Sequence, residues 1–219
     1  MKKILYAFLI LMFAASTGHA QFGGLLGGKK KSAGTDKDAY IAQGKQLIQG
    51  YALMQSTLLE VGAAQAEAEG DNAKAEEYRV LAKTLADDPS TKDFDKVKQA
   101  SEEIREKQSD TAKRSVEYTA KGKAALQKTL PKATASFAGG VALSVLSVKW
   151  LAEYPDQLKA AGTFGKLKLL KELKVPLYVA KEIPSALKTL PTLTKAMGHA
   201  KKQGVDVKDA EKQAAGIKL

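Results

Sequence analysis

The chain has 219 residues, a formal net charge of +11, no cysteine and two histidines, His19 and His199. Without cysteine it can form neither a disulfide nor a thiolate metal site, and it lacks the cysteine that anchors a bacterial lipoprotein. With so few imidazoles as well, we expect no zinc, haem or copper site and no cofactor.

Residues 1–20 are organised like a secretory signal peptide. A positively charged start and an apolar run, residues 4–15, precede Gly18-His19-Ala20, which puts small residues where a signal peptidase reads the chain. The apolar run would rise only about 18 Å as a helix, well short of the roughly 30 Å of a hydrocarbon core. We therefore predict cleavage after Ala20 and a periplasmic or secreted protein. The alternative is an uncleaved membrane anchor.

Residues 21–34 contain five glycines and three consecutive lysines, which do not suit a helix or a strand. This composition predicts a flexible leader. Its apolar residues Phe22, Leu25 and Leu26 could dock on a surface, but a tail left after processing is the simpler interpretation.

Apolar residues spaced by three and four predict a long helix from about residue 38 to residue 69. Gly44, Gly50 and Gly62 lie within it, and each costs about 1 kcal/mol in helix propensity. We therefore expect another helix to approach this one closely at the glycines.

A second helix is expected to end at Asp87-Asp88-Pro89. Residues 69–89 resemble the second half of a tetratricopeptide unit. No second copy follows at the repeat length of about 34 residues, so we interpret this stretch as an ordinary helical hairpin. A third, heavily charged helix is expected from about residue 93 to residue 130, with one narrow contact face. Pro131 is expected to start a new helix, and Pro155-Asp156 to start a short one that ends at Gly162.

Residues 133–148 contain no charged side chain. One interpretation is the central buried helix of a bundle, and on this view Val145→Asp would unfold the protein. The other is a segment that inserts into a membrane. Trp150 and Tyr154 follow beside a lysine, as aromatic residues do at a membrane–water boundary, so both are candidate membrane-interface residues.

Prolines divide the region from residue 164 to residue 198 into short helical pieces. Pro176, Pro184 and Pro191 would each occupy the first turn of a helix. Apolar residues are expected to face inward, namely Leu167, Leu170, Leu173, Leu177, Ile183, Leu187, Leu190, Leu193 and Met197. Lysines are expected to face outward, and the candidates for contact with an anionic surface are Lys166, Lys168, Lys171, Lys174, Lys181 and Lys188. The alternative is a bundle edge whose lysines only keep it soluble.

These patterns predict an all-α fold, an irregular multi-helix bundle with long amphipathic helices, a buried apolar helix and a proline-broken C-terminal helical region. The bundle domain would span residues 35–204, and residues 205–219 would form a polar helical tail. Strand and hairpin signals are nearly absent.

No catalytic motif such as G-x-S-x-G, H-E-x-x-H or a phosphate-binding P-loop is present, so we expect a protein that is not an enzyme. Residues 118–219 carry 18 basic and 7 acidic side chains. We predict an exported binding protein of the bacterial cell envelope whose basic C-terminal half contacts an anionic envelope component, with peripheral membrane contact, or an unknown partner protein. The alternative is a membrane-inserting α-helical protein of the pore-forming kind. Nucleic acid is not an expected partner of an exported chain with three arginines, and the oligomeric state is left open.

Overall fold

The computed structural model describes residues 37–86, 88–111 and 116–217, and every regular element in these ranges is helical. The prediction of an all-α, multi-helix fold is confirmed. The predicted signal peptide and leader, residues 1–34, lie outside the described residues, so cleavage after Ala20 stays a prediction.

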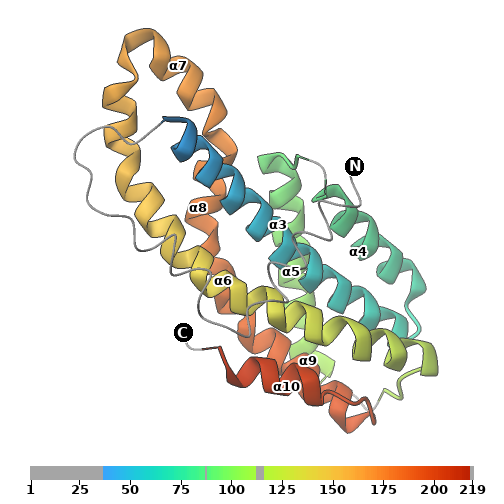
Figure 1. The fold of residues 1–219 in the computed structure, drawn as a ribbon. Helices are drawn as coiled ribbons and strands as arrows, with labels where there is room; N and C mark the ends of the chain where they lie inside the picture. Colours follow the sequence, from blue (N-terminus) through green and yellow to red (C-terminus); the bar gives the residue numbers. More distant parts are fainter. Residues whose placement is uncertain (1–36, 87, 112–115, 218–219) are drawn as a thin grey trace, which may run out of the picture. The chain divides into compact units, whose positions relative to one another are not determined.

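The long helix α3 contacts most of the others. The helices are α3 (Lys37–Ala68), α4 (Asn72–Thr84), α5 (Thr91–Thr111), α6 (Ala120–Ala160), α7 (Gly162–Glu172), α8 (Lys174–Ala186), the 3₁₀ turn η1 (Leu187–Thr189), α9 (Leu190–Lys202) and α10 (Lys208–Ala215). Helix α3 packs against α4, α5, α6 and α8, with α6 as its main partner (Figure 1). Large buried side chains of α3 and α6, among them Tyr40, Leu58, Phe137 and Trp150, meet in the core.

The expected close approach at the glycines of α3 is confirmed. A Cβ atom at Gly44 would lie 3.1 Å from Cζ2 of Trp150, tighter than ordinary van der Waals contact. A Cβ at either of the other two glycines would overlap a neighbouring side chain. Gly44 lies against Pro176 of α8 and Trp150 of α6, Gly50 against Leu143 of α6, and Gly62 against Ile104 of α5.

The prediction of one continuous helix from residue 93 to residue 130 is wrong, because α5 ends at Thr111 and α6 begins at Ala120. Thr119 caps the new helix by accepting a hydrogen bond from the backbone N–H of Gly122 at 3.2 Å. Its own N–H donates to the carbonyl of Ala68 at 2.9 Å, which ties the start of α6 to the end of α3. Threonine is a favoured N-cap residue, so Thr119 was the signal in the sequence for a helix start at this point.

The expected breaks at Pro131 and Pro155 are also wrong, because both prolines lie inside α6. A proline in a helix interior removes a backbone hydrogen bond at a cost of about 3 kcal/mol. The extensive contact of α6 with α3 offsets that cost. Pro176 and Pro191 do lie in first turns, whereas Pro184 lies in the last turn of α8, so the prediction for Pro184 is wrong.

The uncharged segment 133–148 is buried on one side only, so the prediction of a central helix buried all round is wrong. Phe137 is fully buried and Leu143 nearly so. On the other side, Val145 is 48% exposed and Val148 is 59% exposed. The absence of charge therefore marks a helix with one side in the core and one apolar side facing outward.

The expectation that Val145→Asp unfolds the protein is revised accordingly. Because Val145 is half in solvent, an aspartate there can remain hydrated, and we expect a loss of less than about 1 kcal/mol in unfolding free energy. Leu130→Asp would place a carboxylate in a fully buried position of the same helix and should prevent folding. Denaturant titration followed by circular dichroism compares the two. Equal losses would contradict the one-sided burial of α6.

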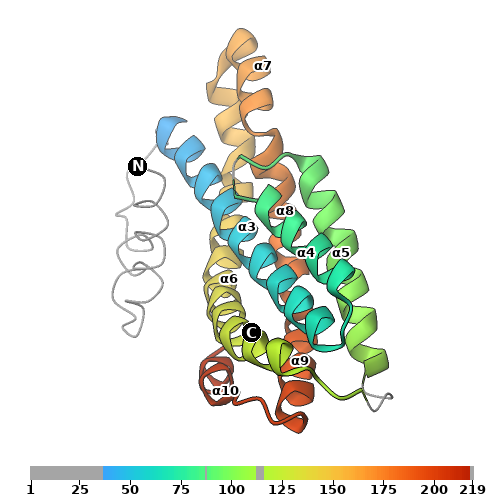
Figure 2. The ribbon, with the colours of Figure 1, turned by 90° about the vertical axis from the view of Figure 1, so that its right-hand side faces the viewer.

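The described part of the C-terminal segment contains helix α10 and packs against the bundle. Helix α10 contacts α6. Val205, Val207 and Ala210 are buried. Helix α10 lies at the opposite end of the bundle from α7 (Figures 1 and 2).

Candidate functional site

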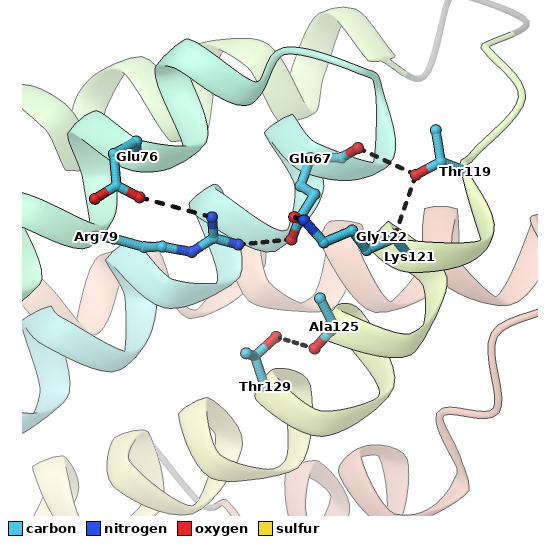
Figure 3. A network of polar contacts seen from close by, with 8 residues as sticks. All are labelled: Glu67, Glu76, Arg79, Thr119, Lys121, Gly122, Ala125 and Thr129. Carbon is cyan, nitrogen blue, oxygen red and sulfur yellow. Dashed lines mark hydrogen bonds and ion pairs between the residues drawn. The ribbon is translucent and has the colours of Figure 1, made fainter.

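The most enclosed charged group in the described residues is Glu67, whose side chain is 4% exposed. Nη2 of Arg79 lies 2.6 Å from Oε2 of Glu67, and Nζ of Lys121 lies 2.6 Å from Oε1 (Figure 3). The hydroxyl of Thr119 donates to the backbone carbonyl of the same glutamate at 3.1 Å. This network joins the end of α3 to α4 and to the start of α6.

The surroundings of Glu67 keep its carboxylate ionised. The hydrogen bond from Lys121 holds the pKa of Glu67 below its usual value, and Arg79 acts in the same direction against the opposing effect of burial. A general acid needs a raised pKa, and both oxygens of this carboxylate are already occupied. The network therefore fits a structural role better than a catalytic one.

The lowered pKa of Glu67 makes stability depend on acid pH. A group whose pKa is lower in the folded chain than in the unfolded chain stabilises the fold at any pH above its unfolded pKa, about 4.3. This stabilisation is lost as the pH falls through the pKa of the folded chain. Glu67→Gln should lower the free energy of unfolding by about 1–2 kcal/mol at neutral pH. The loss is no larger because water partly screens the charges of Arg79 and Lys121. The variant should also lose less stability than the parent between neutral pH and pH 3. Denaturant unfolding at a series of pH values measures both effects, and parallel curves would contradict the assignment.

A second group of charges lies between α4 and α5. Nζ of Lys74 is 2.6 Å from Glu103 and 3.0 Å from Glu77, and the hydrogen bond to Glu103 is the main reason that the pKa of Lys74 is raised. Both glutamates are largely exposed. Within the described ranges, no three His, Cys, Asp or Glu side chains gather as a metal site would require.

The two predicted membrane-interface aromatics differ in their placement. Trp150 is 1% exposed and stacks on Tyr40, with ring centroids 4.5 Å apart and planes 4° from parallel. Trp150 therefore offers no surface to a membrane in this fold. Tyr154 packs against the core but remains partly exposed.

The six lysines predicted to contact an anionic surface are all exposed, and they divide between two surfaces. Lys166, Lys168 and Lys171 lie on α7, where Lys168 is 3.9 Å from Glu172. The other three belong to a continuous helical run from Lys174 to Lys202, formed by α8, η1 and α9.

That run carries a regular series of lysines. The lysine face consists of Lys174, Lys181, Lys188, Lys195 and Lys202, all exposed and each seven residues after the one before. An ideal helix drifts only about 20° in seven residues, so consecutive lysines of the series lie on the same side of the run. The remaining exposed residues of the run are Pro184, Ser185, Pro191, Thr194, Gly198 and Lys201.

No carboxylate is exposed on this run. Its single acidic residue, Glu182, is partly buried and lies 3.2 Å from Nζ of Lys98 on α5. The seven-residue spacing is visible in the sequence, but its meaning depends on the helices following one another in register. The prolines predicted separate short helices, and for this reason the series was missed.

The exposure of two leucines on α7 contradicts part of the prediction that the apolar residues of this region face inward. Leu167 is 67% exposed and Leu170 is 42% exposed, although both were expected to face inward. Leu169 is fully buried instead, whereas Leu173, which directly follows α7, is fully buried as expected. The outer face of α7 consists of Lys166, Leu167, Lys168, Leu170 and Lys171, all exposed, and the exposed Glu172 lies at its end.

Helix α6 has a further property that bears on membranes. Among the described helices it alone has the length and apolar composition to cross a bilayer, and 33% of its most apolar stretch is buried. Core helices of soluble proteins can have the same length and apolar composition.

The structure thus places the predicted lysines on the lysine face and on the outer face of α7. Both surfaces offer exposed ammonium groups. Comparison with protein-family models, curated proteins and solved structures finds no match.

Proposed function

We propose that this chain is an exported, non-enzymatic binding protein of the bacterial cell envelope, which contacts an anionic envelope component through its lysine face. The observation that carries this proposal is a series of exposed lysines along one helical run with no exposed carboxylate. Export rests on the signal-like residues 1–20.

The dimensions of the lysine face suit an extended anionic surface. A helical run from Lys174 to Lys202 is about 43 Å long, with neighbouring lysines about 10 Å apart along it. Lys174, Lys181 and Lys188 form no ion pair with any other described residue. Charges of one sign that are not neutralised within the protein add to one another and attract an anionic partner.

Solubility alone does not require this arrangement. Helix α5 is also exposed on its outer side, and there acidic and basic side chains are mixed, as with Lys92, Asp95, Lys96 and Glu102. Mixed charge of this kind keeps a surface hydrated without attracting a polyanion. The absence of exposed acids from the run Lys174–Lys202 therefore favours a binding surface over a merely solvated bundle edge.

The proposal is tested by neutralising part of the lysine face. The triple variant Lys174→Gln, Lys181→Gln and Lys188→Gln should bind anionic vesicles about a hundredfold more weakly than the parent chain, because each lysine near such a surface contributes about 1 kcal/mol. Co-sedimentation at low salt measures the affinity. The matched control is Lys45→Gln, Lys83→Gln and Lys92→Gln, exposed lysines of α3, α4 and α5.

The control variant loses the same net charge and should keep most of its affinity. If both variants weaken binding equally, overall charge is responsible and the lysine face is not the contact. Circular dichroism should show unchanged helicity in both, because all six side chains are exposed.

A second candidate function is membrane insertion of the pore-forming kind. The outward apolar side of α6, with Val145 and Val148, is the observation that favours it. Release of a trapped dye from anionic liposomes by about micromolar protein would support this second candidate. Liposomes that remain intact while the protein binds them would exclude it and leave peripheral binding.

A further inference from the structure

We infer that the anionic component is a lipid bilayer surface, and that the outer face of α7 inserts Leu167 and Leu170 into it. This inference deepens the proposed function and rests on it. The lysine face would supply attraction to the anionic headgroups, and the outer face of α7 would supply apolar contact.

The first reason is that the two exposed leucines have lysines as neighbours. The exposed large apolar side chains of the described residues are Val80, Val145, Val148, Leu167 and Leu170. Only the two leucines share a short helix with three lysines, since Lys166 and Lys168 flank Leu167, and Lys171 follows Leu170. Exposed leucines next to lysines characterise helices that lie in a membrane interface.

The second reason is chemical complementarity. A bilayer with anionic lipids offers negative headgroups above an apolar layer, and a lysine can reach up to the headgroups while its carbon chain remains among the lipids. A soluble polyanion, such as an acidic polysaccharide, has no apolar layer to receive a leucine. The combination of Lys166, Leu167, Leu170 and Lys171 on one outer face therefore selects a lipid surface.

The third reason is position. Helix α7 lies at the end of the bundle opposite α10, where it can approach a flat surface (Figures 1 and 2). Its inner side is fixed by the buried Leu169 and Leu173, which keeps Leu167 and Leu170 outward. Helix α7 ends at Glu172, and the lysine face starts two residues later at Lys174, so the two surfaces are continuous along the chain.

The absence of native cysteine allows a direct test of insertion. Leu167→Cys and Leu170→Cys are each labelled with a polarity-sensitive fluorophore in the purified full chain. On vesicles that contain phosphatidylglycerol, both labels should shift to shorter emission wavelength and become protected from an aqueous quencher. Val80→Cys, an exposed aliphatic position on α4, is the matched control and should show neither change.

A second measurement asks whether the leucines contribute affinity. Leu167→Ser with Leu170→Ser should weaken binding to these vesicles about a hundredfold, or about tenfold for each leucine removed from an apolar environment. Binding of the same variant to dextran sulfate, a soluble polyanion, should be unchanged. Val80→Ser should alter neither the affinity for vesicles nor the affinity for dextran sulfate.

The outcomes separate this inference from the proposed function. Salt-sensitive vesicle binding with labels at Leu167 and Leu170 that stay in water would overturn the inference and leave the proposed function standing. Binding to dextran sulfate but not to vesicles would also overturn the inference and leave the proposed function standing. Binding to neither at low salt would overturn both.

Discussion

Replacing Trp150 with alanine should lower the free energy of unfolding by about 3–5 kcal/mol. The indole is buried against Tyr40, and its Nε1 donates to the Tyr40 carbonyl at 2.9 Å. The Tyr40 hydroxyl donates in return to the Trp150 carbonyl at 3.0 Å. This reciprocal pair joins the first turn of α3 to α6, so truncation removes both packing and a buried hydrogen bond.

Two variants show which part of that loss comes from the indole. Trp150→Phe keeps an aromatic ring but leaves the Tyr40 carbonyl without its donor, and it should cost about 1–3 kcal/mol. Val148→Ala lies two residues away on the exposed side of α6 and should change stability by less than about 0.5 kcal/mol. Denaturant unfolding followed by circular dichroism suits all three variants, since Trp150 is the chain's one tryptophan. A loss below 1 kcal/mol for Trp150→Ala would contradict the packing of α6 on α3.

Replacing Gly122 with alanine should destabilise the protein by about 3 kcal/mol or more, although alanine is the better helix former. A Cβ atom at Gly122 would overlap the backbone Cα and N of Ala68. Backbone atoms cannot move aside as a flexible side chain can, so the start of α6 must withdraw from the end of α3. That withdrawal also strains the contacts of Thr119 and Lys121 with Glu67.

Gly198 provides the matched control for this prediction. It lies within α9, and a Cβ there would meet no atom within 4 Å. Gly198→Ala should therefore stabilise the protein by up to about 1 kcal/mol, the ordinary gain from helix propensity. Thermal unfolding of the two variants should move in opposite directions. A Gly122→Ala protein as stable as the parent would show that α3 and α6 do not meet at this point.

The long helix α3 was predictable because its evidence is local. Its apolar spacing predicts one helix over the right residues, and the cost of Gly44, Gly50 and Gly62 in a helix predicts close neighbours. Which helices those neighbours are depends on contacts between distant parts of the chain. Spacing along the chain carries no such information.

The errors concern features that tertiary contacts decide. Pro131 and Pro155 predict breaks by local rules, yet contact of α6 with α3 keeps them within one helix. The charged stretch before Ala120 lacks a glycine or proline, so the break there was missed although Thr119 is a suitable cap. Val145 was expected in the core because its segment has no charge, but absence of charge does not say which side of a helix is covered.

The candidate site was predictable in composition and not in arrangement. The lysines between residue 166 and residue 188 were expected to face outward, and the structure places them at the surface. The lysine face emerges only when α8, η1 and α9 follow one another as one helical run. The exposure of Leu167 and Leu170 follows from Leu169 of α7 and the adjoining Leu173 lying on the buried side.

The most direct test of the proposed function is the affinity of the purified chain for anionic vesicles as a function of ionic strength. The distance over which charges act falls from about 30 Å at 0.01 M salt to about 8 Å at 0.15 M. Attraction through the lysine face predicts tight binding at the lower concentration and at least a tenfold loss at the higher one, with no binding to vesicles of neutral lipid. Absence of binding at 0.01 M salt to both the anionic vesicles and dextran sulfate, or an affinity for the anionic vesicles that salt does not change, would contradict the proposal.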